Sequence, residues 1–286
     1  MKSLSRYILE SLINEGGNAV KCERIPAEVA LKLYKDIEAV VTSKFHGVEM
    51  RVLGSVGKKK AGDTNGDIDI AINVTEVDKL MNIINVCFPN CEVNPTSAPG
   101  IVSIGYQYTY KGKDMVGQVD FMCQEDLDWA EFFYSSPDYT KDESLYKASL
   151  RNALMSLVVS EIPTVEEPTM VDGQYETRYK HTLSMLGLSK QFLDYRGKKG
   201  LLKNPKKVKE MERFITKNKY ELVEFMFNSR DLSIVNSLES LWNAIHTPLF
   251  RYPEVVERIE ERFFKEILEA NGLDKDEFIK ICRNRK

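Results

Sequence analysis

Apolar positions at helical spacing mark two segments in the early part of the chain. After Ile25-Pro26 they recur every three or four residues, which predicts a helix to about Phe45 with Pro26 in its first turn. Residues 77–88 show the same spacing, and residues 1–15 suit a short amphipathic helix. The apolar positions of the helix that begins near Pro26 are Val29, Leu33, Ile37, Val40 and Val41.

Alternating patterns between these helices predict strands. Within residues 67–74 the isoleucines fall on one face, whereas Asp67 and Asp69 fall on the other, because side chains two apart on a strand point the same way. A polar loop rich in glycine and lysine covers residues 54–66, and residues 111–114 predict a hairpin turn. The expected strands are residues 48–53, 67–74, 101–110 and 115–122.

From Glu125 onward the pattern predicts helices almost throughout, with breaks at prolines and glycines. The last clear helix is expected from about Pro253 to Ala270, with Gly272 just past its end. We therefore expect an α+β protein with two domains. Residues 1–125 would form a small mixed or antiparallel sheet with helices, and residues 126–286 a mainly helical part.

The amino-acid composition limits which binding partners are expected, but it does not identify one. Of 286 residues, 43% are hydrophobic and 29% charged, which is ordinary for a globular protein. The net charge of −3 gives no general attraction for polyanions, so a nucleic acid would need a local basic patch. Lys58–Lys60 and the stretch from Lys198 to Arg213 are candidates, and the second is equally well a solvated surface.

No apolar run approaches the roughly 18 residues that a membrane helix requires, so we expect a cytoplasmic protein with no membrane partner. Five cysteines without a Cys-x-x-Cys pair fit reduced thiols. The aromatic-rich residues 129–139 are expected in a core more than in base stacking.

Candidate chemistry gathers where the expected strands end. Gly54-Ser55 lies at a strand end, where glycine allows close approach and serine offers a hydroxyl and an amide to a phosphate. The carboxylates of Asp67 and Asp69 project from the same face of the strand and repel each other. A hard cation such as Mg²⁺ relieves this repulsion. The alternative is an edge strand with a solvated acidic face. Asp120 lies in an apolar strand and needs a partner, which is either a metal, or a nearby lysine or loop amides.

The order of these features over residues 48–124 resembles the DNA polymerase β-like nucleotidyltransferase superfamily. That resemblance implies that Gly54 and Ser55 grip a nucleoside triphosphate, while Asp67 and Asp69 bind two Mg²⁺ or Mn²⁺ ions. It implies that Asp120 helps to bind the catalytic ion and can deprotonate the attacking hydroxyl. It also implies that the second part of the chain closes the cleft for nucleotide and acceptor.

Three basic residues are further candidates for the triphosphate. Lys147 and Arg151 are four apart, hence on one face of a helix, and Lys58 closely follows the Gly-Ser pair. Ordinary helix solvation is the alternative for the first two.

Four further sequence features are Glu15–Ala19, Gly54–Lys58, Gly66–Asp69 and Tyr146-Lys147 with Arg151. Together they resemble a group of bacteriophage nucleotidyltransferase-like proteins, and this narrower resemblance implies that the protein acts in the cytoplasm of a host.

We therefore expect transfer of a nucleoside monophosphate from a triphosphate to an acceptor hydroxyl, with release of pyrophosphate. The Lys198–Arg213 stretch favours an RNA 3′ end as acceptor. A small molecule, a protein side chain, or a second nucleotide in oligonucleotide or cyclic-dinucleotide synthesis would be served by the same residues. A catalytically inactive nucleotide-binding module is disfavoured because all three carboxylates are present. The sequence does not indicate the base, the choice between Mg²⁺ and Mn²⁺, or the oligomeric state.

Overall fold

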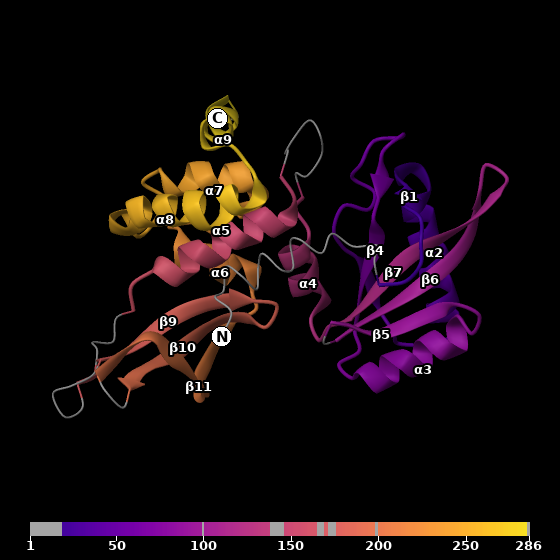
Figure 1. The fold of residues 1–286 in the computed structure, drawn as a ribbon, viewed down its shortest axis with the longest axis horizontal. Coiled ribbons are helices and arrows are strands. Elements are labelled where there is room, and N and C mark those ends of the chain that lie inside the picture. The colour runs from indigo at the N-terminus through magenta and orange to yellow at the C-terminus, as the bar shows by residue number, and fades with distance from the viewer. Residues whose placement is uncertain are drawn as a thin grey trace. The chain divides into compact units, whose positions relative to one another are not determined.

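The computed structural model describes residues 19–98, 100–137, 146–164, 169–170, 176–197 and 200–284. The chain divides into two compact units, residues 1–149 and 150–286, which differ in colour in Figure 1. The helix expected at residues 1–15 and the run Glu15–Asn18 lie outside the described residues.

Five of the described strands in the first unit form a mixed sheet with the order β2-β4-β7-β6-β5. Strands β4 and β7 are parallel, and the other neighbours are antiparallel. A separate two-stranded pair joins β1 to β3. The strands are β1 (Ile25–Pro26), β2 (Met50–Val52), β3 (Thr64–Asn65), β4 (Asp67–Ile72), β5 (Glu92–Ala98), β6 (Ile101–Tyr110) and β7 (Lys113–Cys123), and the helices are α2 (Ala27–Lys44), α3 (Val77–Cys87) and α4 (Leu127–Tyr134). The mixed sheet, the helices expected at about residues 26–45 and 77–88, and the strands expected before residue 125 are confirmed.

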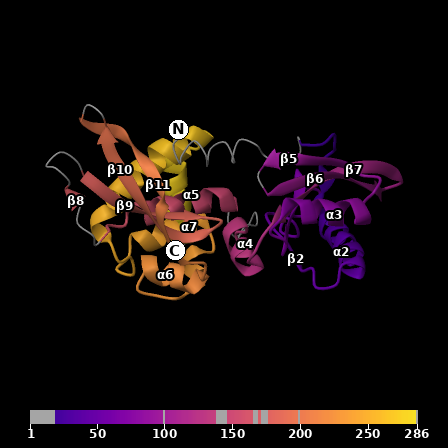
Figure 2. The ribbon, with the colours of Figure 1, turned by 90° about the horizontal axis from the view of Figure 1, so that it is seen from below.

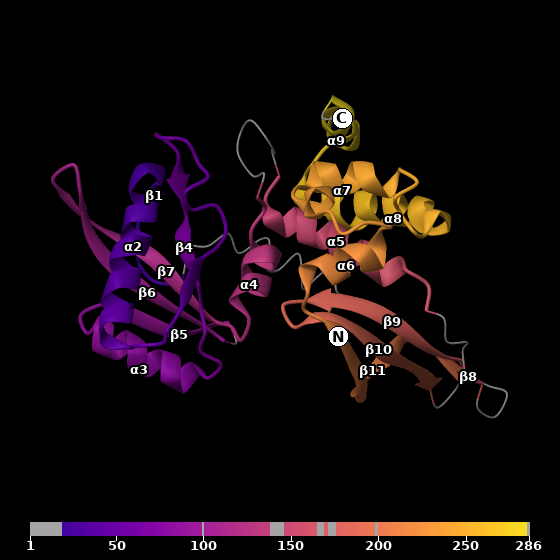
Figure 3. The same cartoon turned by 180° about the vertical axis from the view of Figure 1, so that it is seen from behind.

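Alternation along β4 and β7 assigns their side chains to two different faces of the sheet. Helices α2 and α3 cover one face, where Ile68, Ile70 and Phe121 are buried in the main core (Figure 3). Helix α4 packs near β2 and β4 on the other face, through a smaller cluster that includes Leu53 and Ala71. The aspartates of β4 and β7 belong to this second face, because they alternate with the isoleucines and phenylalanine of the first.

The second unit contains an antiparallel sheet that the sequence pattern did not predict. Its described strands have the order β11-β10-β9-β8 (Figure 2). The expectation of helices almost throughout residues 126–286 is therefore wrong for the described residues between 169 and 216. The strands are β8 (Thr169–Met170), β9 (Glu176–Ser184), β10 (Gly187–Gly197) and β11 (Gly200–Thr216).

Helices pack on this sheet and account for the rest of the second unit. The Ser156 hydroxyl of α5 donates to the carbonyl of Leu183, and the ring of His181 lies edge-on to Phe225. The expected last helix is confirmed, and it ends at Gly272, whose left-handed φ of 66° suits glycine. The helical segments are α5 (Ala148–Glu161), α6 (Lys219–Met226), η1 (Leu232–Val235), α7 (Leu238–Ile245), η2 (Pro253–Val255), α8 (Val256–Arg262), η3 (Phe263–Leu268), η4 (Glu269–Asn271) and α9 (Lys275–Asn284).

Two further expectations concern helices. Trp129 of α4 is buried and packs against Phe132 and Phe133, in agreement with a core role. Among the described residues, no helix is both long enough and apolar enough to cross a membrane.

Candidate metal centre

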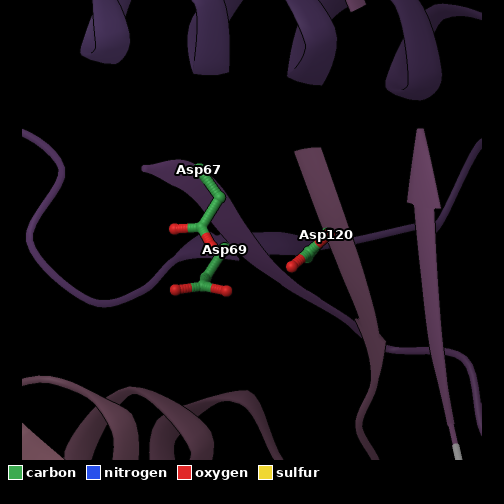
Figure 4. Close-up of side chains that lie close together, drawn as sticks. All are labelled: Asp67, Asp69 and Asp120. Atoms are coloured by element: carbon green, nitrogen blue, oxygen red, sulfur yellow. The ribbon is translucent and has the colours of Figure 1, made fainter. Parts of the chain in front are cut away.

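Three carboxylates converge on the face of the first sheet that α2 and α3 leave free. The parallel register of β4 and β7 places Asp69 opposite Asp120, and Asp67 lies two residues before Asp69 on the same face. One oxygen of each carboxylate lies within 4.8 Å of the others. Figure 4 shows Asp67 and Asp69 on one strand and Asp120 on its neighbour, with the carboxylates turned to a common space.

These carboxylates are partly buried, and the negative charge of one disfavours ionisation of its neighbours. Burial raises the pKa of Asp69 well above its usual value, and the charges of Asp67 and Asp120 raise it further. Burial and Asp120 raise the pKa of Asp67 to about 6. The pKa of Asp120 is also raised by burial, although hydrogen bonds from Ser103 and Gln118 favour its charged form. Among the described residues, no basic side chain contributes to the pKa shift of Asp69, whereas basic side chains lower the pKa of Asp67.

A divalent cation fits this arrangement. Mg²⁺ and Mn²⁺ prefer oxygen ligands, and three carboxylate oxygens at this separation supply them from one side while leaving other positions for water or substrate. An added positive charge would also relieve the repulsion that raises the pKa of Asp69. The donor set, its spacing and its electrostatics therefore agree with the expected metal site.

Gly54 allows the chain to pass directly beside this cluster. Its φ of 66° lies in the left-handed region, and a Cβ at this position would come within 3.1 Å of Asp69 Oδ2. The Leu53 N–H donates to the Asp69 carbonyl over 2.8 Å, which fixes the end of β2 against β4. A side chain at residue 54 would therefore strain the backbone and push on a carboxylate.

Ser55 is held by a neighbour that the sequence analysis did not single out. Its hydroxyl lies 3.1 Å from Oδ1 of Asn65, a residue of β3 that is almost fully buried. The Nδ2 atom of Asn65 has no hydrogen-bond partner among the described residues. A buried amide with spare donor capacity thus lies against the loop that is expected to grip phosphate.

Three cations act on Asp67. Lys147, Lys59 and Arg24 each lower the pKa of Asp67, although burial and Asp120 outweigh them. Arg24 Nε donates to the Thr64 hydroxyl and Lys59 Nζ to the Thr64 carbonyl, both over 2.8 Å. The pKa of Lys59 is lowered by burial and then by the charges of Lys147 and Arg24, so these cations repel one another. A bound anion would relieve that repulsion.

Of these cations, only Lys147 was a specific candidate from the sequence. Lys59 belonged to the basic run Lys58–Lys60, but nothing distinguished it from its neighbours. Arg24 carried no local signal, since it reaches Thr64 through the pairing of β1 with β3, forty residues along the chain.

Two other predicted phosphate ligands have different surroundings. Lys58 Nζ donates to the carbonyl of Ser136 over 3.0 Å, which ties the loop to the segment after α4. Arg151 belongs to the second unit, where it is fully buried and donates to the carbonyl of Val235. Within the second unit Arg151 is therefore packed in the interior, where its guanidinium is bonded to the Val235 carbonyl.

Residues 200–213 of the basic stretch Lys198–Arg213 lie in β11, and residues 198–199 are outside the described residues. Lys206, Lys207 and Arg213 are exposed there.

The chain matches no protein-family model and no curated protein. Any statement about function therefore rests on the chemistry of this site.

Proposed function

We propose that the protein is a metal-dependent nucleotidyltransferase that moves a nucleoside monophosphate from a triphosphate to an acceptor hydroxyl. The observation that carries the proposal is the convergence of Asp67, Asp69 and Asp120 beside a glycine turn, with a group of cations at its edge. Carboxylates that hold cations and cations that attract phosphates are the two parts that phosphoryl transfer requires.

The carboxylates have distinct roles in this proposal. Asp67 and Asp69 would hold two divalent ions, with Asp120 as a further ligand of one of them, and these ions would supply the positive charge that stabilises the entering and leaving oxygens of an in-line displacement at phosphorus. The acceptor oxygen bonds to the α-phosphorus, the bond to the β-phosphate oxygen breaks, and pyrophosphate leaves. An oxygen of Asp120 accepts the proton of the acceptor hydroxyl.

The loop and the cations orient the triphosphate. The backbone at Gly54 approaches closely because it carries no side chain, and Ser55 offers its amide and hydroxyl. Arg24, Lys59 and Lys147 supply positive charge next to Asp67, where a chain of phosphates would neutralise their mutual repulsion. Positioning and neutralisation of charge supply most of the catalysis in reactions of this kind.

An RNA 3′ end is the acceptor that we propose first. The exposed side chains of Lys206, Lys207 and Arg213 support it, since contacts to phosphate dominate non-specific binding of nucleic acids. A small molecule, a protein side chain or a second nucleotide would use the same carboxylates, and the identity of the labelled product distinguishes these acceptors.

The test is transfer of label from each α-³²P-labelled nucleoside triphosphate to a pool of small RNAs, with Mg²⁺ or Mn²⁺. We expect labelled RNA with the wild-type protein and none with the Asp67→Asn/Asp69→Asn variant. Asp114→Asn is the matched control, because Asp114 is an exposed carboxylate of β7 outside the cluster, and it should transfer label normally.

Three other results are informative. Label on the protein itself or in a small product retains the reaction and changes the acceptor. Equal transfer by the wild type and the double variant contradicts the role of the carboxylates. No transfer with any acceptor, together with metal-dependent binding of the triphosphate, would instead indicate an inactive nucleotide-binding module.

A further inference from the structure

Gln118 makes direct contact with the third carboxylate of the centre. It lies on β7 two residues before Asp120, so both side chains leave the same face of the sheet. Its Nε2 atom lies 3.0 Å from Asp120 Oδ1 and 3.1 Å from Oδ2. Only 2% of its surface is exposed, so its amide is not a solvated surface group that meets the carboxylate by chance.

The orientation of the Gln118 amide is set by the chain that precedes α2. The Ala19 N–H donates to Gln118 Oε1 over 3.0 Å, across 99 residues of sequence. A backbone N–H can only donate, so Oε1 must face Ala19 and the amide nitrogen must face Asp120. The direction of the contact with Asp120 is therefore fixed by the Ala19 backbone.

Ala19 is itself held in place. Asn94 of β5 donates through Nδ2 to the Ala19 carbonyl over 2.8 Å. A few residues later the Glu23 N–H donates to the Val116 carbonyl of β7, also over 2.8 Å. This segment runs beside β7, and the same short stretch carries Arg24, one of the cations that act on Asp67.

Asp120 is thus held from two sides. Ser103 lies opposite Asp120 in the β6–β7 register and hydrogen-bonds to it, while Gln118 contacts both carboxylate oxygens. In Figure 4 the Asp120 carboxylate points towards the other two aspartates. Groups that bond to a metal ligand orient it and raise its affinity for the ion.

We propose that Gln118 is a positioning residue that holds the Asp120 carboxylate ready for a divalent ion, and that the Ala19 backbone holds Gln118. The inference rests on the proposed metal centre. A purely structural role for Gln118, tying the segment at Ala19 to the sheet, would change stability without changing the affinity for metal.

The test compares Mn²⁺ binding to the full-length wild type and to Gln118→Met, which keeps the length of the side chain and removes the amide. Free Mn²⁺ is followed by electron paramagnetic resonance, and thermal unfolding is recorded in EDTA and in Mn²⁺. We expect Mn²⁺ to bind about 10–100-fold more weakly at one site. The rise in Tm that Mn²⁺ produces should shrink accordingly. Gln107→Met, an exposed glutamine on the neighbouring strand β6, is the matched control and should bind Mn²⁺ as the wild type does.

A second variant keeps the test decisive if Gln118→Met does not fold. Asn94→Ala leaves Gln118 and Asp120 intact and removes the donor to the Ala19 carbonyl. It should weaken Mn²⁺ binding in the same direction and by less.

The outcomes separate this inference from the proposed function. Weaker binding by Gln118→Met, with normal binding by Gln107→Met, supports the positioning role. If Gln118→Met binds Mn²⁺ as tightly as the wild type, even with a lower Tm in EDTA, the positioning role of Gln118 is contradicted and the proposed metal centre is unaffected. A wild-type protein that binds no Mn²⁺ overturns the metal centre and this inference together.

Discussion

The two faces of the β4–β7 pair carry opposite chemistry on the same backbone. Ile70 and Phe121 lie opposite each other in the register and are fully buried under α2 and α3. One residue away on the same strands, Asp69 and Asp120 face the other side with a third carboxylate close by. One face gains stability by removing apolar surface from water, whereas the other gathers charges that repel.

Alternate side chains of these two strands therefore serve different purposes: those on one face stabilise the fold, and those on the other form the candidate metal centre. Substitutions on the apolar face should change stability and leave the chemistry of the surviving folded protein alone. Substitutions on the carboxylate face should impair the chemistry, because each removes a metal ligand. They should also stabilise the metal-free protein, because each removes a negative charge that the other carboxylates repel.

The largest effect expected from this comparison is that of Asp69→Asn. Transfer should fall by about 10³-fold or more, since loss of one preorganised electrostatic group alone can cost about 10²–10³-fold. The metal-free protein should become more stable, with a Tm that rises by a few degrees, because a neutral amide removes a charge that burial and its neighbours disfavour. Transfer rates and thermal unfolding in EDTA measure both changes. A metal-free variant that is less stable than the wild type would break the comparison.

Ile70→Ala should show the opposite behaviour. Removing a fully buried side chain between Val52 and Phe121 should destabilise the protein by about 2–5 kcal/mol, measured by denaturant unfolding. At a temperature where the variant is still folded, its affinity for Mn²⁺ should equal that of the wild type. A large loss of affinity in the folded variant would mean that the two faces are not independent.

Gly54→Ala places a methyl group at the edge of the carboxylate face. The left-handed φ should cost about 1–2 kcal/mol of stability, and pressure on Asp69 Oδ2 should reduce transfer by about tenfold or more. Gly62→Ala is the matched control, because Gly62 has a φ of 92° with nothing within 4 Å of its Cβ position. It should lose similar stability and keep its activity. Equal loss of activity in both variants would assign the effect to backbone strain alone.

The smallest effect is a pH dependence of the metal-free protein. The pKa of Asp67 is about 6 in the folded protein and about 4 in an unfolded chain. A raised carboxyl pKa stabilises the fold below the unfolded value, and that contribution is lost as the pH rises through the folded value. The contribution of Asp67 to stability in EDTA should therefore fall by about 1–2 kcal/mol between pH 4 and pH 7, after allowance for solvent screening of a partly exposed group. Asp69 and Asp120, whose pKa values are also raised, should change the stability in the same direction.

Saturating Mg²⁺ should reduce that fall, because the ion binds the ionised carboxylates. Asp67→Asn should reduce it as well. Unfolding curves in EDTA at several pH values measure the change. A stability that rises steadily from pH 4 to pH 7 in EDTA would contradict the assigned direction of the shift.

The sequence was sufficient where local alternation decides the structure. The period of two along residues 67–72 placed the isoleucines on one face and Asp67 and Asp69 on the other, and the strand around Asp120 followed from its apolar neighbours. Each of these predictions depends on side chains within a few residues of one another.

The second unit shows where local pattern misleads. In β11, Val208, Met211 and Ile215 recur at spacings of three and four among lysines and glutamates, which imitates one face of a helix. The segment instead pairs with β10, with shifts in register along the way. Pairing with a neighbouring strand overrides local propensity, and no single segment of sequence reveals that neighbour.

The neighbours of the aspartates were missed for a related reason. Arg24, Asn65 and Gln118 act through contacts that the fold creates between distant parts of the chain, such as the bond from Ala19 to Gln118. A glutamine in a strand gives no signal until its partner is known.

The central claim is that the carboxylate face holds two divalent ions beside a triphosphate. The most direct measurement is a crystal structure with Mn²⁺ and a non-hydrolysable nucleoside triphosphate, with the ions located by anomalous scattering. We predict two peaks about 3.5–4 Å apart between Asp67, Asp69 and Asp120, with the phosphates against Gly54 and Ser55. A bound triphosphate with no anomalous peak at these carboxylates would contradict the account.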